Sequence, residues 1–153
     1  MIPRKVKTIL DENGLIPLEF ESGSTPTSEL AAAKIGCDVG QIAKSMLFKG
    51  KDGLFRLIVC PGDRRVDNKK LKKTLGVQAR MATAEETESI TGFRPGAVCP
   101  FGIEGLEIFI DDGLRRFEVI YPAAGTNASG VPTNFDELAT IIAGLSCDVM
   151  KIN

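Results

Sequence analysis

The sequence contains no histidine. Histidine is the commonest general acid or base and the commonest nitrogen ligand for metals, so any chemistry here must use other groups. Four cysteines are present without a C-x-x-C motif, at Cys37, Cys60, Cys99 and Cys147. A zinc site would need these thiols, or a carboxylate, to converge from distant positions. We expect instead reduced thiols that pack as small hydrophobic groups, and we predict no metal and no cofactor.

Long apolar stretches are also missing. No segment approaches the roughly 20 apolar residues that cross a bilayer, so no membrane span is expected. The first residues have no long apolar core before charges return, which is unlike a signal peptide. Together with the scattered thiols, this predicts a cytoplasmic protein. The net charge is -1, so a polyanion would have to be held by a local patch of Lys and Arg.

The chain has the length and composition of one globular domain. It has 153 residues, of which 43% are hydrophobic and 25% charged, and this balance argues against disorder. No repeat, low-complexity tract or linker divides it. We therefore predict a single domain over residues 1–153.

Capping residues and apolar spacing predict the elements. Helices are expected over residues 3–13, 28–34, 69–75, 84–91 and from 133 or 134 to near 144, with caps at Thr27, Asn68 and Thr83. Strands are expected over residues 17–21, 42–49, 54–60, 106–110, 117–121 and 149–152. Because short turns join several strand pairs, the pattern predicts an α/β (α+β) domain with a mixed, mostly antiparallel, barrel-like sheet surrounded by helices.

One lysine, Lys44, interrupts an otherwise apolar run from Ile42 to Phe48. In a strand, Lys44 would share a face with Met46 and Phe48, because side chains alternate between faces. An ammonium costs several kcal/mol to bury without a partner. Lys44 is therefore either at an edge, reaching water or a carboxylate, or a fixed cation for a phosphate or carboxylate ligand.

A rigid loop, G-A-V-C-P, runs from Gly96 to Pro100. Glycine lets the backbone approach a ligand closely, and proline restricts the loop. The N–H groups of Ala97, Val98 and Cys99 could form an anion or oxyanion site. The alternative is a structural turn between a helix and a strand.

Two further segments have a ligand-binding composition. Residues 123–130 offer small side chains, hydroxyls and an amide, which suit either a small pocket or a surface connection. The basic cluster of the chain comprises Arg64 and Arg65 and the four lysines of K-K-L-K-K, which are Lys69, Lys70, Lys72 and Lys73. It is a candidate contact for a nucleic-acid backbone or else a solvated helix face. No aromatic residues interleave with it, so base stacking is not indicated there.

Five segments in series resemble the YbaK/prolyl-tRNA synthetase-associated domain family, the free-standing relatives of the bacterial prolyl-tRNA synthetase editing domain. They are T-S-E-L-A-A-A-K-I-G (27–36), Q-I-A-K-S-M-L-F-K-G (41–50), V-C-P-G-D-R-R-V-D-N-K-K-L (59–71), T-G-F-R-P-G-A-V-C-P-F-G (91–102) and A-G-T-N (124–127), followed by a helix containing D-E-L. The similarity spans nearly the whole chain. The lysine strand, the P-G-D-R-R-V-D run and the G-x-x-x-P loop together make it specific.

The resemblance implies an enzyme that hydrolyses the ester joining a wrong amino acid to the 3′ end of tRNA. It implies that Lys44 is the essential lysine and that Gly96 and Pro100 belong to the loop that cradles the aminoacyl group. Substrate-binding roles are expected for Ser45, Ala97, Val98, Cys99, Gly125, Thr126 and Asn127. Charged tRNA is the implied substrate, and an aminoacyl-tRNA synthetase is a further candidate partner.

Such a site can work without histidine because an aminoacyl ester is already activated. Lys44 would anchor the phosphate of the terminal adenosine, backbone amides would stabilise the oxyanion, and a ribose hydroxyl or bound water would manage the proton. Small residues around Gly125 favour a small amino acid, with alanine, cysteine, serine and threonine as candidates. Two alternatives stay open: a module that binds tRNA or a synthetase without hydrolysis, and a phosphate-ligand hydrolase or binding protein of the same fold.

Overall fold

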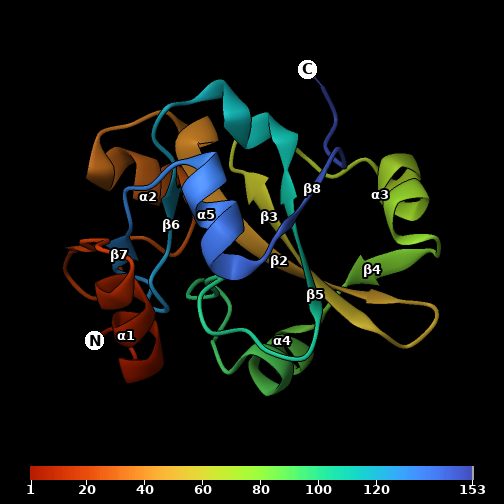
Figure 1. Ribbon diagram of the computed structural model, residues 1–153, viewed down its shortest axis with the longest axis horizontal. Helices are drawn as coiled ribbons and strands as arrows, with labels where there is room; N and C mark the ends of the chain where they lie inside the picture. Colours follow the sequence, from red (N-terminus) through yellow and green to blue (C-terminus); the bar gives the residue numbers. More distant parts are fainter. Residues whose placement is uncertain (153) are drawn as a thin grey trace.

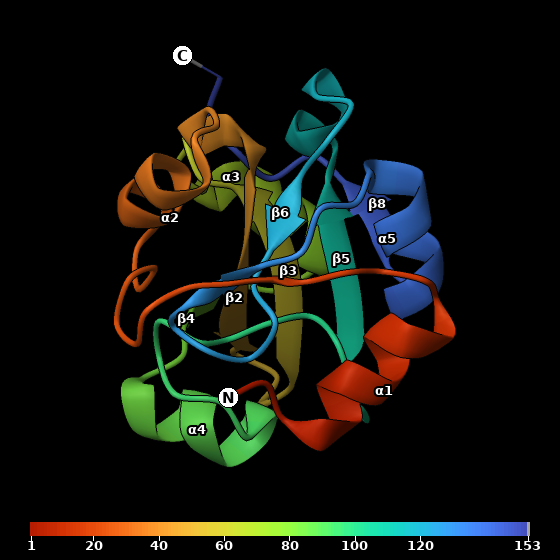
Figure 2. The same ribbon diagram turned by 90° about the vertical axis from the view of Figure 1, so that its left-hand side faces the viewer.

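A mixed sheet forms the centre of the protein, and helices surround it (Figures 1 and 2). The computed structural model describes residues 1–152. The strand order of the main sheet is β4-β2-β3-β5-β8, and β6 pairs with β2 beside this path. The bounds are β2 Ile42–Gly50, β3 Phe55–Pro61, β4 Ala79–Met81, β5 Glu107–Asp111, β6 Tyr121–Pro122 and β8 Leu145–Cys147. A separate pair joins β1 Leu18–Glu19 to β7 Ser129–Gly130.

The helices connect these strands. They are α1 Arg4–Glu12, α2 Ser28–Ile35, α3 Asn68–Leu75, α4 Ala84–Thr91 and α5 Phe135–Ile142, with short 3-10 helices η1 Val39–Gln41 and η2 Asp112–Arg116. The hydroxyls of Thr27 and Thr83 accept from Leu30 N and Glu86 N, so both predicted caps are confirmed. Within residues 1–152, no helix has the length and apolar character needed to cross a bilayer.

The sheet is mixed and open. β2 pairs antiparallel with β3 and β4, whereas the β2–β6, β3–β5 and β5–β8 pairs are parallel. The predicted fold class, an α/β domain with a mixed sheet and packed helices, is confirmed. β4 and β8 lie at opposite ends of the strand order and do not pair with each other, so the sheet stops short of a closed barrel.

Two cores lie on opposite faces of this sheet. One face carries Leu47 and packs against α1 and α5 through side chains such as Leu10 and Leu138. The other carries Phe48 and packs against Leu71 of α3. Full burial of one such side chain stabilises the fold by about 1.5–3 kcal/mol. The alternation of β2 between these cores directs Lys44 toward the α3 side and Ser45 toward the α1 side.

Several sequence expectations are corrected. The strand expected at 117–121 is wrong for residues 117–119, because η2 turns the chain and pairing with β2 begins only at Tyr121. The strand expected at 149–152 is reduced to one antiparallel bridge between Met150 and Val66, because Val149 N–H donates to the Asp111 carboxylate rather than to a strand. β8 at Leu145–Cys147 was not expected. β4 and β7 were not expected. α3 begins one residue earlier than predicted, with Asp67 as its cap.

The edge of β2 that faces away from β3 is divided. β6 pairs with Ile42 and Ala43, and β4 pairs with residues 48–50. Ala82 N–H donates to the Leu47 carbonyl at 2.9 Å, which extends the β4 side. Residues 44–46 therefore pair with no strand on this edge among the residues described. The gap places Lys44 at an opening in the sheet.

Candidate functional site

A cavity of about 360 Å³ opens at this gap, and we call it the β2 cavity. It joins segments far apart in the sequence: the loop before α2, the start of α2, the unpaired part of β2, the loop of Gly96 and the β6–β7 region. The residues that line it are Thr25, Pro26, Thr27, Ser28, Glu29, Ala31, Ile35, Ile42, Ala43, Lys44, Ser45, Met46, Gly62, Met81, Gly96, Val98, Tyr121, Ala123 and Ser129. Lys44 and the glycine–proline loop thus meet in one cavity.

Lys44 is half-buried and has no protein counter-ion. No hydrogen bond or ion pair among residues 1–152 uses its ammonium group, so pairing with a carboxylate there is ruled out. Its cross-strand neighbour is the buried Cys60. Burial raises the pKa of the Cys60 thiol well above its usual value, although the Lys44 charge acts in the opposite direction. Lys44 therefore offers an uncompensated positive charge to the cavity.

Ser45 carries an unsatisfied hydroxyl. Its Oγ is buried and has no hydrogen-bond partner in the described part of the chain. Leaving such a group unpaired costs about 1–3 kcal/mol, and native proteins rarely do so without a reason. Ser45 lines both the β2 cavity and an adjoining apolar hollow of about 250 Å³. A bound ligand in either space has a hydroxyl available to it.

The loop from Gly96 to Pro100 reaches the cavity only with its first half. Gly96 has φ +87°, and a Cβ there would lie 3.4 Å from the Pro26 carbonyl oxygen. Ala97 N–H donates to the Arg94 carbonyl, so it is not a free donor. The N–H groups of Val98 and Cys99 enter none of the hydrogen bonds formed within residues 1–152. Two of the three expected amide donors thus remain.

The second half of the loop is structural. The Cys99 side chain is buried, and its Sγ lies 3.7 Å from the Phe101 carbonyl oxygen. Burial raises the pKa of this thiol to about 12, so it is neutral near pH 7 and unsuited to act as a nucleophile. Pro100 is buried and does not line the β2 cavity.

The segment of Gly125, Thr126 and Asn127 lies behind the cavity wall. Asn127 Oδ1 accepts from Gly23 N–H at 3.0 Å, which holds the loop before α2 in place. The Thr126 hydroxyl donates to Ser129 Oγ at 2.9 Å. It is Ser129, not the three predicted residues, that lines the cavity. The segment supports the cavity but does not form its surface.

Sequence reasoning missed Thr25 and Tyr121 as lining residues, whereas Ser129 falls in the segment 123–130 that was expected to form either a small pocket or a surface connection. Ser129 N–H donates to Thr25 Oγ1 at 3.2 Å across 104 residues, so this contact depends on tertiary structure. Tyr121, the single tyrosine of the chain, is brought to the cavity by its register with Ile42. A lone tyrosine beside a proline was the one signal available in the sequence.

The residues of the predicted basic cluster have different surroundings, although Lys69 and Lys72 line the same hollow. Lys70 donates to the Asp148 carboxylate and to the Met150 carbonyl, each at 3.0 Å, and so anchors the C-terminal segment. Arg65 lines a hollow of about 290 Å³ together with Lys44. Lys69 lines a larger hollow of about 960 Å³. Neither Arg64 nor Lys73 lines these spaces. Across residues 1–152, no group of three or more Cys, Asp or Glu side chains is placed to hold a metal ion.

This fold and site define a class of protein. Residues 22–141 match the family model of the aminoacyl-tRNA editing domain. Because that match covers most of the chain, the protein belongs to the aminoacyl-tRNA editing domain family. The resemblance seen in the sequence motifs is confirmed.

Individual relatives support the same family assignment. The chain is 41% identical over 122 residues to the uncharacterized protein YwhH of Bacillus subtilis, covering 79% of this chain and 77% of that one. It is 38% identical over 111 residues to the proline–tRNA ligase of Bacillus licheniformis, covering 71% of this chain but only 19% of the ligase. A crystal structure of a candidate trans-editing enzyme for prolyl tRNA synthetase superposes with a TM-score of 0.87 at 31% identity, covering 97% and 96% of the two chains.

Proposed function

We propose that the protein is an aminoacyl-tRNA deacylase that works in trans, hydrolysing the ester of a mischarged tRNA to release a small amino acid. The observation that carries this proposal is the β2 cavity, in which an uncompensated Lys44 ammonium and the Gly96 loop line the same space. The family supports the substrate class. The solved relative described for prolyl tRNA synthetase supports action on tRNA charged by another enzyme.

Lys44 binds a phosphate of the terminal adenosine as a point charge in this mechanism. A lysine ammonium is a compact cation with three donors, and it suits a phosphate oxygen without imposing one geometry. Fixing the phosphate positions the ester relative to the Gly96 loop, and such positioning converts a bimolecular attack into an effectively unimolecular one. Because no carboxylate of residues 1–152 pairs with the ammonium, the phosphate meets a cation without a counter-ion in the described part of the chain.

The loop amides stabilise the tetrahedral intermediate. Val98 lines the β2 cavity, and its N–H enters no hydrogen bond among the described residues, so it supplies the donor. A donor of this kind contributes about 3–4 kcal/mol to transition-state stabilisation in other enzymes. A water molecule attacks the carbonyl carbon, its proton passes to the ribose hydroxyl or to another water, and the tRNA 3′ oxygen leaves with a proton. No metal and no protein base take part in this scheme.

The cavity favours a small side chain. Ala31, Ala43 and Val98 give it short apolar walls, and the terminal adenosine occupies part of its 360 Å³. Alanine fits best, with cysteine, serine and threonine as further candidates. Larger amino acids are excluded by steric clash, and steep discrimination requires either such a clash or an unpaired polar group.

A panel of mischarged tRNAs tests the proposal, with and without an added aminoacyl-tRNA synthetase. Release of one small amino acid faster than spontaneous hydrolysis supports it, and acceleration by the synthetase would identify that enzyme as a partner. Binding of every charged tRNA with no release above the spontaneous rate would contradict it and identify a non-catalytic tRNA-binding module.

A further inference from the structure

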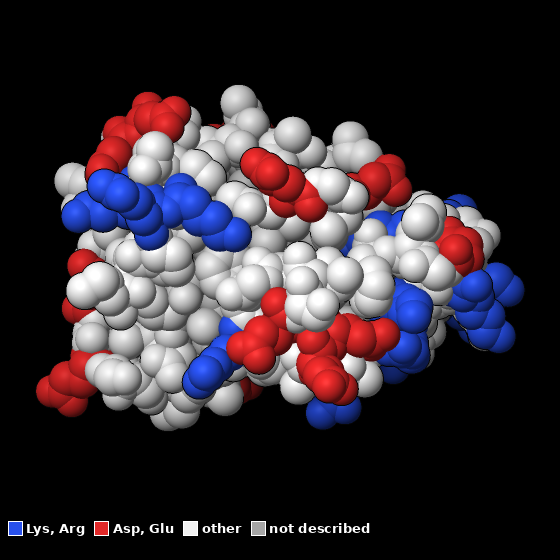
Figure 3. Space-filling model, turned by 90° about the horizontal axis from the view of Figure 1, so that it is seen from below, with Lys and Arg blue, Asp and Glu red and all other residues white. Residues whose placement is uncertain are grey.

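A basic groove lies beside α3, β4 and the β2–β3 hairpin, and its lining differs from that of the β2 cavity. Its volume is about 960 Å³, and the residues that line it are Lys49, Gly50, Lys51, Gly53, Asn68, Lys69, Lys72, Gln78, Ala79 and Arg80. Five of these are cations and none is a carboxylate. Basic side chains gather at this end of the protein in Figure 3, on the side where α3 and β4 lie in Figure 1. We call this the lysine groove.

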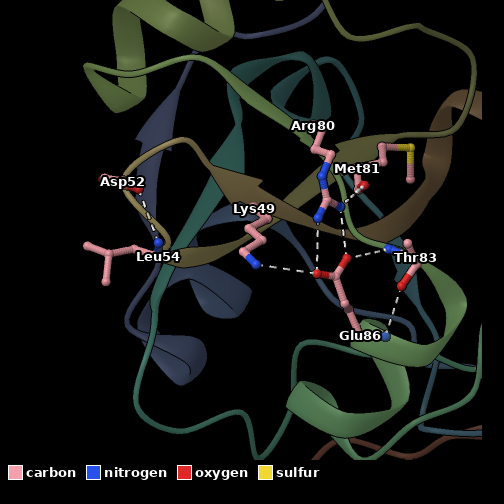
Figure 4. Close-up of polar contacts among 7 residues, drawn as sticks. All are labelled: Lys49, Asp52, Leu54, Arg80, Met81, Thr83 and Glu86. Atoms are coloured by element: carbon pink, nitrogen blue, oxygen red, sulfur yellow. Dashed lines mark hydrogen bonds and ion pairs between the residues drawn. The ribbon is translucent and has the colours of Figure 1, made fainter.

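Two of its five cations share a single carboxylate. Glu86 of α4 contacts Arg80 at 2.8 Å and Lys49 at 3.7 Å, as Figure 4 shows. The carboxylate next to Lys51 in sequence, Asp52, is taken up by two hydrogen bonds from Arg56, at 3.0 and 2.9 Å.

The other three cations are exposed and available. Lys51, Lys69 and Lys72 enter no ion pair with any residue from 1 to 152. The groove therefore presents three lysines without an ion-pair partner among the described residues.

The groove leads to the β2 cavity. A connecting hollow of about 290 Å³ shares Asn68, Ala79 and Arg80 with the groove. The same hollow shares Lys44, Met46 and Met81 with the β2 cavity. A strand of nucleic acid whose end lies at Lys44 thus has a path along the protein surface to the three free lysines.

We propose that Lys51, Lys69 and Lys72 hold the sugar–phosphate backbone of the tRNA acceptor stem, while the unpaired nucleotides before the terminal adenosine cross the connecting hollow. This inference rests on the proposed function, because it assumes that the 3′ end lies in the β2 cavity. Lysines on a groove bind regularly spaced phosphates with little regard to sequence. Helical RNA is recognised mainly through its backbone and shape.

The lining favours RNA over a protein partner. Protein interfaces are centred on large apolar or aromatic anchors, and the groove is lined only by Lys, Arg, Asn, Gln, Gly and Ala. Met46, Phe48, Val66 and Met81 instead line the connecting hollow, where an unpaired base can pack on apolar surface.

The test compares two triple variants that remove the same charge. The groove variant carries Lys51→Ala, Lys69→Ala and Lys72→Ala. The control carries Arg4→Ala, Lys7→Ala and Lys34→Ala, three exposed cations that line neither the groove, the connecting hollow nor the β2 cavity. Binding of an uncharged acceptor-stem RNA hairpin with a CCA end is measured by fluorescence anisotropy over a range of salt concentrations.

We expect the groove variant to bind the hairpin on the order of tenfold more weakly than wild type. Its salt dependence should be shallower by about one unit of slope per lysine removed. The control should bind within about twofold of wild type. Equal weakening of both variants would show a net-charge effect only and would overturn the proposal, as would unchanged binding by the groove variant or no binding by wild type.

A second measurement separates this inference from the proposed function. Amino-acid release is measured from full-length charged tRNA and from an aminoacylated CCA trinucleotide. The groove variant should lose kcat/KM on the tRNA and keep it on the trinucleotide. If wild type binds the hairpin through the groove but releases nothing, the proposed function fails and the groove assignment stands. If wild type releases amino acid and the groove variant matches it on both substrates, only the groove assignment fails.

Discussion

Glu86 of α4 accepts hydrogen bonds from both terminal nitrogens of Arg80 on β4, at 2.8 and 3.1 Å (Figure 4). The same carboxylate accepts from Thr83 N–H and lies 3.7 Å from Lys49. One side chain thus caps α4 and joins it to two strands of the sheet. The hydrogen bonds from Arg80, and after them that from Thr83, lower the pKa of Glu86 to about 2.

This pKa predicts a pH dependence of stability. The folded-state pKa of Glu86 lies below its unfolded value of 4.5, so its contribution is fully present above that pH. The stability that the ionised Glu86 carboxylate contributes should be lost as the pH falls from about 4.5 to about 2. Urea unfolding measured across that window gives the free energy of unfolding at each pH. This free energy should fall less in Glu86→Gln than in wild type, because glutamine keeps the cap but not the charge. The control is Glu85→Gln, a neighbouring first-turn carboxylate without an ion pair among the described residues. Parallel profiles for wild type and Glu86→Gln would contradict the assignment.

Gly96→Ala should lower the rate of amino-acid release by more than its loss of folding stability explains. Gly96 has φ +87°, and a new Cβ would lie in van der Waals contact with Pro26 at the cavity rim. A left-handed alanine costs about 1–2 kcal/mol. Gly105→Ala is the matched control, with φ +79° and nothing within 4 Å of the new Cβ. Both variants should lose similar stability in urea unfolding, and only Gly96→Ala should also lose amino-acid release. Equal activity in the two would remove the loop from the site.

Ser45→Ala should separate binding from stability. The Ser45 hydroxyl has no partner in the protein as described, so its removal should leave the unfolding free energy unchanged or raise it by up to about 1 kcal/mol. Ser129→Ala should instead cost about 1–3 kcal/mol, because Ser129 Oγ accepts from Ala124 N–H and from Thr126. If substrate satisfies the Ser45 hydroxyl, Ser45→Ala raises KM with little change in kcat. A clear loss of stability in Ser45→Ala would contradict the conclusion that the Ser45 hydroxyl has no hydrogen-bond partner in the protein as described.

Local signals predicted the parts of the fold that local physics determines. Thr27 and Thr83 satisfy the first free N–H groups of α2 and α4, and the apolar runs that became β2 and β3 need no distant partner to be read as strands. β4, β6 and β7 have two or three residues each, too short to show a periodicity. They exist because long-range pairing completes them, as the register of Tyr121 with Ile42 illustrates.

The same division applies to the sites. Lys44 was identified from its own strand, because an ammonium in an apolar run is anomalous wherever the chain folds. Of the basic residues clustered in sequence, Lys69 and Lys72 line the lysine groove, whereas Lys70 pairs with Asp148. The groove adds Lys51 from a hairpin and Arg80 from a strand. No window of sequence contains that arrangement.

The most direct measurement of the central claim is amino-acid release from a mischarged tRNA by Lys44→Ala, with Lys7→Ala as control. Lys44 makes no ion pair with any described residue, so its removal should leave thermal unfolding within a few degrees of wild type. We predict that release falls to the spontaneous rate in Lys44→Ala and stays at the wild-type rate in Lys7→Ala. A folded Lys44→Ala protein that deacylates tRNA as fast as wild type would contradict the account.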